Sequence, residues 1–183
     1  NIDNAGTIQA VNSVDMDATR GSVYNYAGIN STAGYVDIEA GEDIINLGDN
    51  EADTIIARGE VKLNAGDILL NTAQITSIAD KVIIEADNGV FNLLDSEYND
   101  PNNKSSKNGY IQAAGSVEIK TTNNDNNTST GIFTGVYNSA SIHSGGIVLI
   151  YSKGNLNNRG DIQAAAYVDL DSWNNLTNTG NII

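Results

Sequence analysis

The side chains best suited to chemistry in this sequence are carboxylates that recur two residues apart. Asp15 and Asp17 form one such pair, and Asp37 and Glu39 form a second. Paired carboxylates at a defined separation supply the acid and the base of glycoside hydrolysis, and they also bind hard cations such as Ca²⁺. Both uses need a pocket or a converging set of ligands. The chemistry that these pairs can perform therefore depends on how the chain places them relative to each other.

Other reactive side chains are scarce. The 183 residues include no Cys and one His (His143), and the formal net charge is −14. This composition excludes disulfides, thiol chemistry and Cys-ligated metals, and a single His is too few for a His-cluster metal site. The acidic balance argues against nucleic-acid binding, because phosphates need a basic face. No apolar run approaches the roughly 18 residues of a membrane span. We expect no cofactor, no metal, no nucleic acid and no membrane span.

A repeated pattern determines where the carboxylates lie. A Val-x-Ile/Leu/Met triplet recurs along the chain, its shortest spacings are 20 to 22 residues, and a small residue stands two positions after each triplet. The triplets begin at Val14, Val36, Val61, Val82, Val117, Val148 and Val168. An apolar-x-Asn step closes every unit, and an Ile usually opens the next strand about four residues later. Alternation with a period of two predicts strands, so each unit contains three short strands.

Three strands per unit without an intervening helix favour an all-β, parallel β-helix, or solenoid, of about eight turns of roughly 20–22 residues. The Val, Ile and Leu columns then stack inside the coil, and the small residues lie where the chain bends sharply. The Asn column suits corners, because Asn tolerates left-handed backbone and because stacked amides can form hydrogen bonds along a ladder. A β-sandwich is the alternative, but it does not require one residue class at successive equivalent positions.

The predicted outer surface has an apolar column and two insertions. On the Asn-bearing strands, five consecutive turns place apolar or aromatic side chains outward: Tyr24, Ile45, Leu70, Phe91 and Tyr137. The insertions, at about 93–108 and 121–135, follow different strands and are expected at different corners. Either Leu93, Leu94 or Tyr98 folds over the column, or the column and Tyr98 form a partner site. The insertions are either recognition loops or tolerated polar decoration.

The middle strand of each unit carries the carboxylate pairs outward. Asp15 should lie over Asp37, and Asp17 over Glu39, at about 5 Å. Such neighbours repel each other unless solvent and counter-ions screen them or a cation bridges them, and we expect a solvated face. Regular columns on a flat face make a poor pocket, so we expect no catalytic residue. The alternative is a polysaccharide-binding or polysaccharide-cleaving β-helix of the pectate-lyase-like kind.

The unit from Asn158 to Gly180 reads Asn-x-Gly-x-Ile-x-Ala, then Val-x-Leu, then Leu-x-Asn-x-Gly. It resembles the haemagglutinin repeat of filamentous-haemagglutinin-like exoproteins, which are adhesins and contact-dependent growth-inhibition proteins exported by two-partner secretion. The resemblance extends from Asn4 to Ile182. It implies a right-handed β-helix in a fibre on a Gram-negative surface. The implied partners are an outer-membrane transporter during export and a host or bacterial cell-surface receptor or glycan.

The position of this segment within such a protein follows from two observations. Pro101, in Asp100-Pro101-Asn102, does not match the Asn-Pro-Asn signature of the family's export domain. Both termini cut into the repeat, so we expect residues 1–183 to be one repeat segment of a longer protein. The expected function is that of a rigid stalk in a secreted or cell-surface bacterial fibre, which mediates adhesion or presents a receptor-binding or toxin region.

Overall fold

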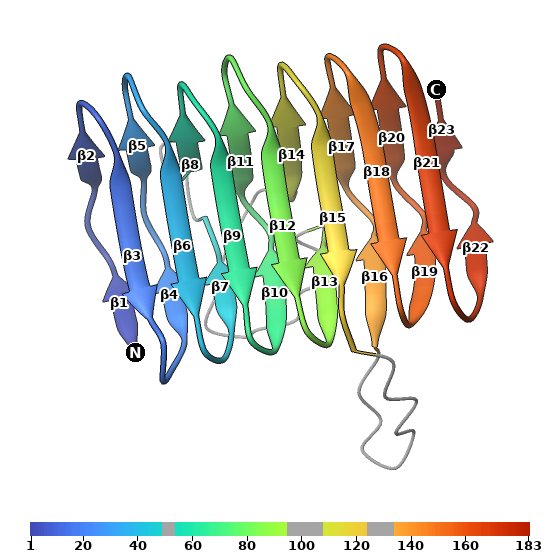
Figure 1. Cartoon of the computed structure of the whole chain (residues 1–183), viewed down its shortest axis with the longest axis horizontal. Helices are drawn as coiled ribbons and strands as arrows, with labels where there is room; N and C mark the ends of the chain where they lie inside the picture. Colours follow the sequence, from blue (N-terminus) through green and yellow to red (C-terminus); the bar gives the residue numbers. More distant parts are fainter. Residues whose placement is uncertain (49–53, 95–107, 124–133) are drawn as a thin grey trace.

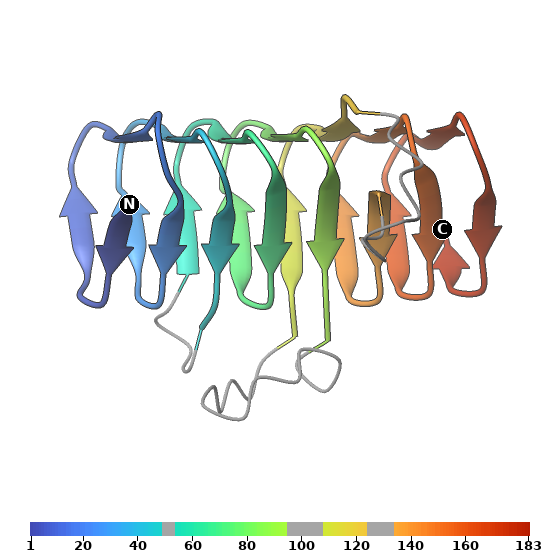
Figure 2. The same cartoon turned by 90° about the horizontal axis from the view of Figure 1, so that it is seen from below.

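The structure, a computed structural model, describes residues 1–48, 54–94, 108–123 and 134–183, and every regular element in these ranges is a strand. Successive strands join three parallel sheets in rotation (Figure 1). Seven complete turns and two strands of an eighth build a right-handed parallel β-helix, which confirms the predicted fold class. The two termini lie at opposite ends of the coil (Figures 1 and 2).

Each sheet takes every third strand. The first sheet contains β1 (Ile2–Asn4), β4 (Val23–Asn25), β7 (Ile44–Asn46), β10 (Ile68–Asn71), β13 (Gly89–Asn92), β16 (Gly135–Asn138), β19 (Asn155–Asn158) and β22 (Leu176–Asn178). The second contains β2 (Ile8–Ala10), β5 (Ile29–Ser31), β8 (Thr54–Ala57), β11 (Gln74–Ser77), β14 (Tyr110–Ala113), β17 (Ser141–Ser144), β20 (Asp161–Ala164) and β23 (Asn181–Ile182). The third contains β3 (Val14–Ala18), β6 (Val36–Ala40), β9 (Val61–Ala65), β12 (Val82–Ala86), β15 (Val117–Thr121), β18 (Ile147–Ser152) and β21 (Tyr167–Ser172).

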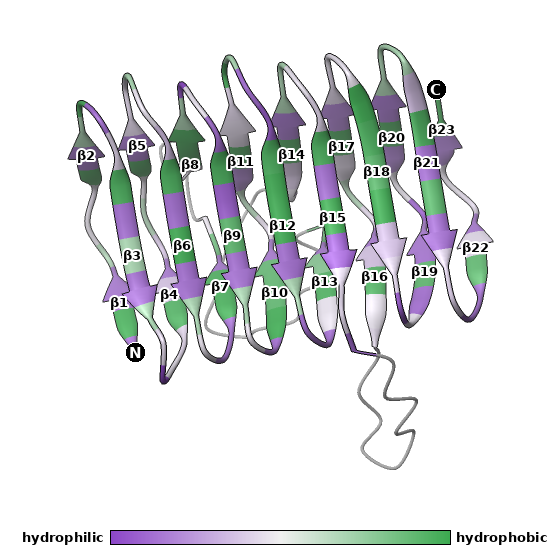
Figure 3. Cartoon of the chain, in the orientation of Figure 1, coloured by the Kyte–Doolittle hydropathy of each residue, from purple (hydrophilic) through white to green (hydrophobic). Residues whose placement is uncertain are grey.

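The core is a set of continuous columns inside the coil. In β6, Val36, Ile38 and Ala40 are buried, whereas Asp37 and Glu39 point outward. The same classes pair with each other from turn to turn, so Val stacks on Val along the third sheet. Figure 3 shows the resulting alternation of apolar and polar bands on strands such as β6 and β21. Burial of each large side chain contributes about 1.5–3 kcal/mol, and only the neighbouring turns can provide it.

Eight asparagines form a continuous ladder at the ends of the first-sheet strands. At each step the side-chain Nδ2 of one Asn donates to the Oδ1 of the Asn on the next turn, over 2.7–2.9 Å. The members are Asn4, Asn25, Asn46, Asn71, Asn92, Asn138, Asn158 and Asn178. All except Asn178 are buried. The asparagine ladder therefore satisfies amides that would otherwise be buried without partners.

The predicted amide ladder is confirmed, but one reason given for the Asn column is wrong. No residue other than Gly has a positive φ in the described ranges, so these asparagines do not act as left-handed corner residues. Each one is the last residue of a strand and has extended backbone. What the position requires is the side-chain amide, because only a group that both donates and accepts can continue the ladder.

The two long intervals in the repeat fall at different corners. The first separates β13 from β14 and joins the first sheet to the second, and the second separates β15 from β16 and joins the third sheet to the first. Thr121 still belongs to β15 and Gly135 already belongs to β16, so the second interval is shorter than 121–135. Gly135 has a φ of 126°, and a Cβ there would lie 2.0 Å from the carbonyl oxygen of Asn155. Only Gly fits at this first position of β16.

Candidate interaction surfaces

Five of the six predicted interaction residues lie in one outward column of the first sheet. Consecutive members pair directly between adjacent strands, in the order Tyr24, Ile45, Leu70, Phe91 and Tyr137. All five side chains are half-buried. Asp3 and Asn157 are the next residues at the two ends, so polar positions bound this apolar column. Tyr98 lies outside the described residues, and its part in the surface stays a prediction.

Aromatic contacts occur near both ends of the apolar column. The ring of Tyr24 stacks on that of Tyr26, with centroids 6.5 Å apart and planes inclined by 6°. The guanidinium of Arg159 lies 5.6 Å from the ring centroid of Tyr137, within the range of a cation–π interaction. Leu93 is buried and directly follows the last residue of β13. The column thus forms a half-exposed apolar strip that follows the axis across five turns.

The predicted acidic group of Asp15, Asp17, Asp37 and Glu39 lies on the outer face of the third sheet. Asp15 pairs with Asp37, and Asp17 with Glu39, as the repeat predicted. With Met16 they line a shallow hollow of about 120 Å³. Within the described ranges, no three or more His, Cys, Asp or Glu side chains are grouped so as to hold a metal ion. Asp15, Asp17 and Glu39 are exposed, so the hollow presents stacked carboxylates to solvent.

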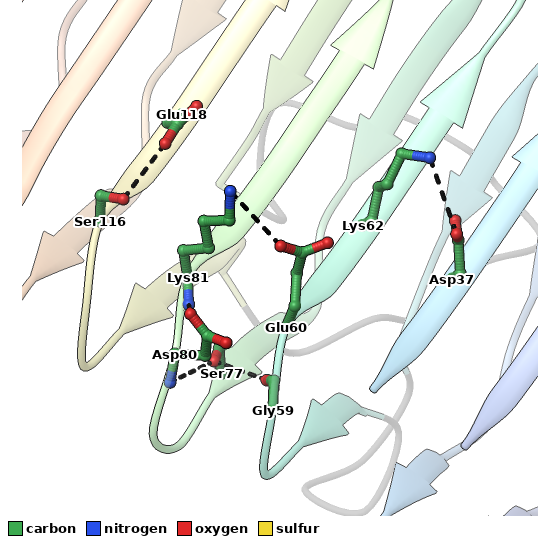
Figure 4. A network of polar contacts seen from close by, with 9 residues as sticks. All are labelled: Asp37, Gly59, Glu60, Lys62, Ser77, Asp80, Lys81, Ser116 and Glu118. Carbon is green, nitrogen blue, oxygen red and sulfur yellow. Dashed lines mark hydrogen bonds and ion pairs between the residues drawn. The ribbon is translucent and has the colours of Figure 1, made fainter. Parts of the chain in front are cut away.

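Ion pairs between adjacent turns neutralise part of the third-sheet surface. They join Lys62 to Asp37, Lys81 to Glu60 and Lys120 to Glu85, over 3.5–3.6 Å. Figure 4 shows the first two, together with the hydrogen bond from the Ser116 hydroxyl to Glu118. All these side chains are substantially exposed, so each pair contributes about 1 kcal/mol or less. Each lysine thus neutralises one carboxylate on the adjacent turn.

A second cluster of carboxylates lies at the corner between the third and first sheets. Burial raises the pKa of Asp43 above its ordinary value of 3.8. A hydrogen bond of 3.2 Å from the backbone N–H of Ile68 to Asp43 Oδ1 opposes that rise, and the charges of Asp67 and Glu42 add to it. Asp67 in turn accepts a hydrogen bond of 2.7 Å from the side chain of Asn88. The surroundings of Asp43 therefore disfavour the ionised form of its carboxyl group.

The single histidine contacts a tyrosine on the outer face of the second sheet. The Tyr110 hydroxyl and Nδ1 of His143 share a hydrogen bond of 3.0 Å, and the rings meet edge to face with centroids 5.2 Å apart. Burial raises the pKa of the Tyr110 hydroxyl above its ordinary value of 10.0. His143 lies between Gln112 and Gln163 in the register, so no carboxylate occupies its column on either adjacent turn. The pair joins two turns of the coil.

The third sheet also carries a groove that sequence analysis did not single out as a site. Two hollows, of about 170 and 210 Å³, share Leu149 and Tyr151 in their linings. The first extends over β12 and β15, where Ile83, Glu85, Glu118 and Lys120 line it. The second extends to β21, where Asp169 and Asp171 line it. We call this surface the third-sheet groove.

A signal for the groove is present in the sequence. On most third-sheet strands the outward residues are charged or amide side chains, but β12 carries Ile83 outward and β18 carries Leu149 and Tyr151. In Figure 3 these two strands are apolar along most of their length. Such unbroken apolar runs predict strands buried on both faces in a parallel sheet. Here the outer face is open, so the run marks an exposed apolar surface.

Comparisons with known proteins give no relative from which to transfer a function. No family model matches the chain, and no curated protein or solved structure matches it significantly. Among the described residues, no helix is long and apolar enough to cross a membrane.

Proposed function

We propose that this chain is a rigid stalk segment of a secreted or cell-surface bacterial fibre, in which it mediates adhesion or presents a receptor-binding or toxin-bearing region. The observation that carries the proposal is the asparagine ladder, which links all eight turns through hydrogen bonds parallel to the axis. Three in-register sheets run in the same direction. Every turn is thereby tied to its neighbours, as a stiff spacer requires. Eight turns at about 4.8 Å extend roughly 40 Å.

The likeness of the repeat to haemagglutinin repeats supports the location. Asn158 to Gly180 carries the residues of that likeness. It supports export through an outer-membrane two-partner transporter and a place on the cell surface. In this proposal the apolar column contacts a cell-surface receptor or glycan, and the chain performs no catalysis.

The location is tested with antibodies raised against the purified chain. Intact cells of the organism that makes the protein are labelled, and permeabilised cells and culture supernatant are analysed in parallel. The proposal expects labelling of intact cells or recovery from the supernatant. Labelling that requires permeabilisation and leaves the supernatant empty would overturn it.

The adhesive part of the proposal is tested with beads coated with the chain. Leu70→Asp together with Phe91→Asp alters the centre of the apolar column, and Asn64→Asp on the outer face of β9 is the control. Beads carrying the wild type and the control should adhere to target cells, and beads carrying the double variant should not. Thermal melting by circular dichroism is measured for each protein. Loss of folding in the double variant would instead mean that the column serves as packing beneath other parts of the chain.

A polysaccharide-binding or polysaccharide-cleaving role is the second candidate, and the third-sheet groove favours it. The carboxylates of Glu85 and Glu118 line the apolar hollow of about 170 Å³, and such groups can hydrogen-bond or protonate a sugar. A reducing-sugar and unsaturated-product assay across acidic polysaccharides tests the cleaving role. Turnover that Glu118→Gln abolishes would replace the stalk by an enzyme as the primary function.

A further inference from the structure

We propose that the third-sheet groove binds an arginine-rich, extended segment of a partner protein. The inference rests on the fold and on the groove rather than on the stalk role, and its test can fail while the stalk role stands. Leu149 and Tyr151 provide apolar surface in both hollows, and carboxylates from three strands line the same hollows. An arginine side chain matches both features, because its stem packs on apolar surface while its guanidinium bonds to carboxylates.

The charges around the groove favour a cation. The lining contains the carboxylates of Glu85, Glu118, Asp169 and Asp171 and one ammonium group, that of Lys120. Lys120 already pairs with Glu85, at 3.6 Å. Within the described part of the chain, neither Asp169 nor Asp171 forms a side-chain hydrogen bond or an ion pair. Two carboxylates therefore lie beside apolar side chains, and no cation among the described residues pairs with either of them.

Tyrosine and tryptophan strengthen the preference for arginine at this end of the third sheet. Tyr151 lines both hollows, Tyr167 is the first residue of β21, and Trp173 directly follows that strand. Lys153 already places its Nζ 5.4 Å from the centroid of Trp173, so a cation of the chain itself uses one of these rings. A planar guanidinium stacks on aromatic faces better than an ammonium does.

The dimensions fit a short extended peptide. The two hollows together cross β12, β15, β18 and β21, which are consecutive neighbours in the sheet. Four strands at about 4.8 Å span about 14 Å, which is the reach of four to five extended residues. A second copy of this chain is a poor occupant, because its net charge of −14 would bring carboxylates against carboxylates.

The chain supplies its own matched control. Asp15 and Asp17 on β3 repeat the Asp-x-Asp spacing of Asp169 and Asp171 on β21. The β3 pair stacks on two further carboxylates, whereas the β21 pair stacks on Leu149 and Tyr151. The two pairs therefore carry equal charge, but only the β21 pair lies beside large apolar side chains. Any binding that needs both charge and apolar surface must distinguish them.

The test is fluorescence anisotropy with a labelled hexa-arginine peptide and the intact chain. Asp169→Asn with Asp171→Asn should weaken binding by at least about fivefold, whereas Asp15→Asn with Asp17→Asn should change it by less than about twofold. Tyr151→Ala should weaken it as well, and added salt should do so throughout. A labelled hexa-glutamate peptide should not bind. Melting curves check that every variant is folded, and the exposed Asp→Asn pair is the least disruptive of them.

Three results would overturn the proposal. Equal losses in the two double variants would show that the peptide responds to overall charge and not to the groove. Displacement of hexa-arginine by a neutral glucose hexasaccharide, blocked by Tyr151→Ala, would show that the groove is a carbohydrate site. Absence of measurable hexa-arginine binding at low salt would show that the groove does not select a cation.

Discussion

At the scale of single residues, the Asn column shows how one side chain can hold a solenoid together. Val or Leu at these positions would also be buried, but neither could satisfy an amide on the turn above or below. Asn is short enough to reach only its own column and has both a donor and an acceptor. Because every step uses the same donor and acceptor atoms, the ladder is directional and tolerates no gap.

A break in the centre of the ladder should be costly. Asn71→Ala leaves Asn46 without the acceptor for its Nδ2 and Asn92 without the donor to its Oδ1. Two buried polar groups then lose a partner, at about 1–3 kcal/mol each, so the free energy of unfolding should fall by at least about 2 kcal/mol. Urea denaturation measures the change.

The control is Asn157→Ala, on the outer face of β19 beside the ladder residue Asn158. It should change the free energy of unfolding by less than about 0.5 kcal/mol. Equal effects of the two substitutions would contradict a structural role for the ladder.

Asp43 gives a prediction on pH. Its pKa is raised in the folded state, chiefly by burial, so the ionised form is disfavoured there relative to the unfolded chain. Asp43→Asn keeps an oxygen that can accept the hydrogen bond from Ile68 N–H and removes the charge. The variant should therefore be more stable at pH 7, by less than about 1 kcal/mol because Asp43 is partly solvated. The gain should disappear as the pH falls through the raised pKa and below 3.8, where both states are protonated.

Thermal melts at pH 7 and pH 3 check this prediction. Asp3→Asn, at an exposed outward position of β1, is the control and should shift stability by less than about 0.5 kcal/mol at either pH. A loss of stability in Asp43→Asn at pH 7 would show that the carboxylate charge is favourable at this corner and would contradict the stated cause.

At the scale of the strand, the alternation of inward and outward side chains determines which residues are essential for folding. Leu69 and Leu70 are neighbours in β10 with the same side chain, yet Leu69 is fully buried and Leu70 belongs to the half-exposed apolar column. Leu69→Asp places a charge among apolar columns and should abolish folding. Leu70→Asp should leave the coil folded, with a loss of about 1 kcal/mol or less from weakened cross-strand contacts. Far-UV circular dichroism and urea titration distinguish the two, and unfolding of Leu70→Asp would mean that the column is covered.

The strands could be predicted from the sequence, whereas the third-sheet groove could not. A period of two and a recurring Val triplet predicted the three strands per turn, because both properties follow from local geometry and stacking. The same alternation places Ile83, Leu149 and Tyr151 outward, but it does not reveal the two hollows that these side chains line. That surface combines residues 20 to 35 positions apart in the sequence, and its shape depends on how the side chains of neighbouring strands pack. The stretches 49–53, 95–107 and 124–133 are outside the described residues, so the predicted role of Tyr98 is untested.

At the scale of the whole molecule, the coil is a one-dimensional assembly whose turns are interchangeable if the register is kept. The chain has a formal net charge of −14, and many of its carboxylates lie on the outer surface of the coil. Ion pairs with Lys62, Lys81 and Lys120 reduce part of the repulsion between these carboxylates. The interior is the same stack of Val, Ile, Leu and small residues from turn to turn. Stability should thus be the sum of turns and of contacts between adjacent turns.

Removal of one whole turn should therefore leave a folded protein. Deletion of residues 68–88 removes β10, β11 and β12 and joins Asp67 to Gly89, the residue that pairs with Ile68 in the intact coil. Asn46 then meets Asn92, so the ladder continues, and the second and third sheets close in the same way. The product should melt cooperatively and be shorter by about 5 Å in X-ray scattering.

The control is deletion of residues 68–77, which removes only β10 and β11. Two third-sheet strands, β9 and β12, then follow each other directly, and the strands cannot regain their pairing between turns. This variant should not fold. Similar unfolding of both deletions would show that the turns are not equivalent and that stability depends on a particular part of the coil.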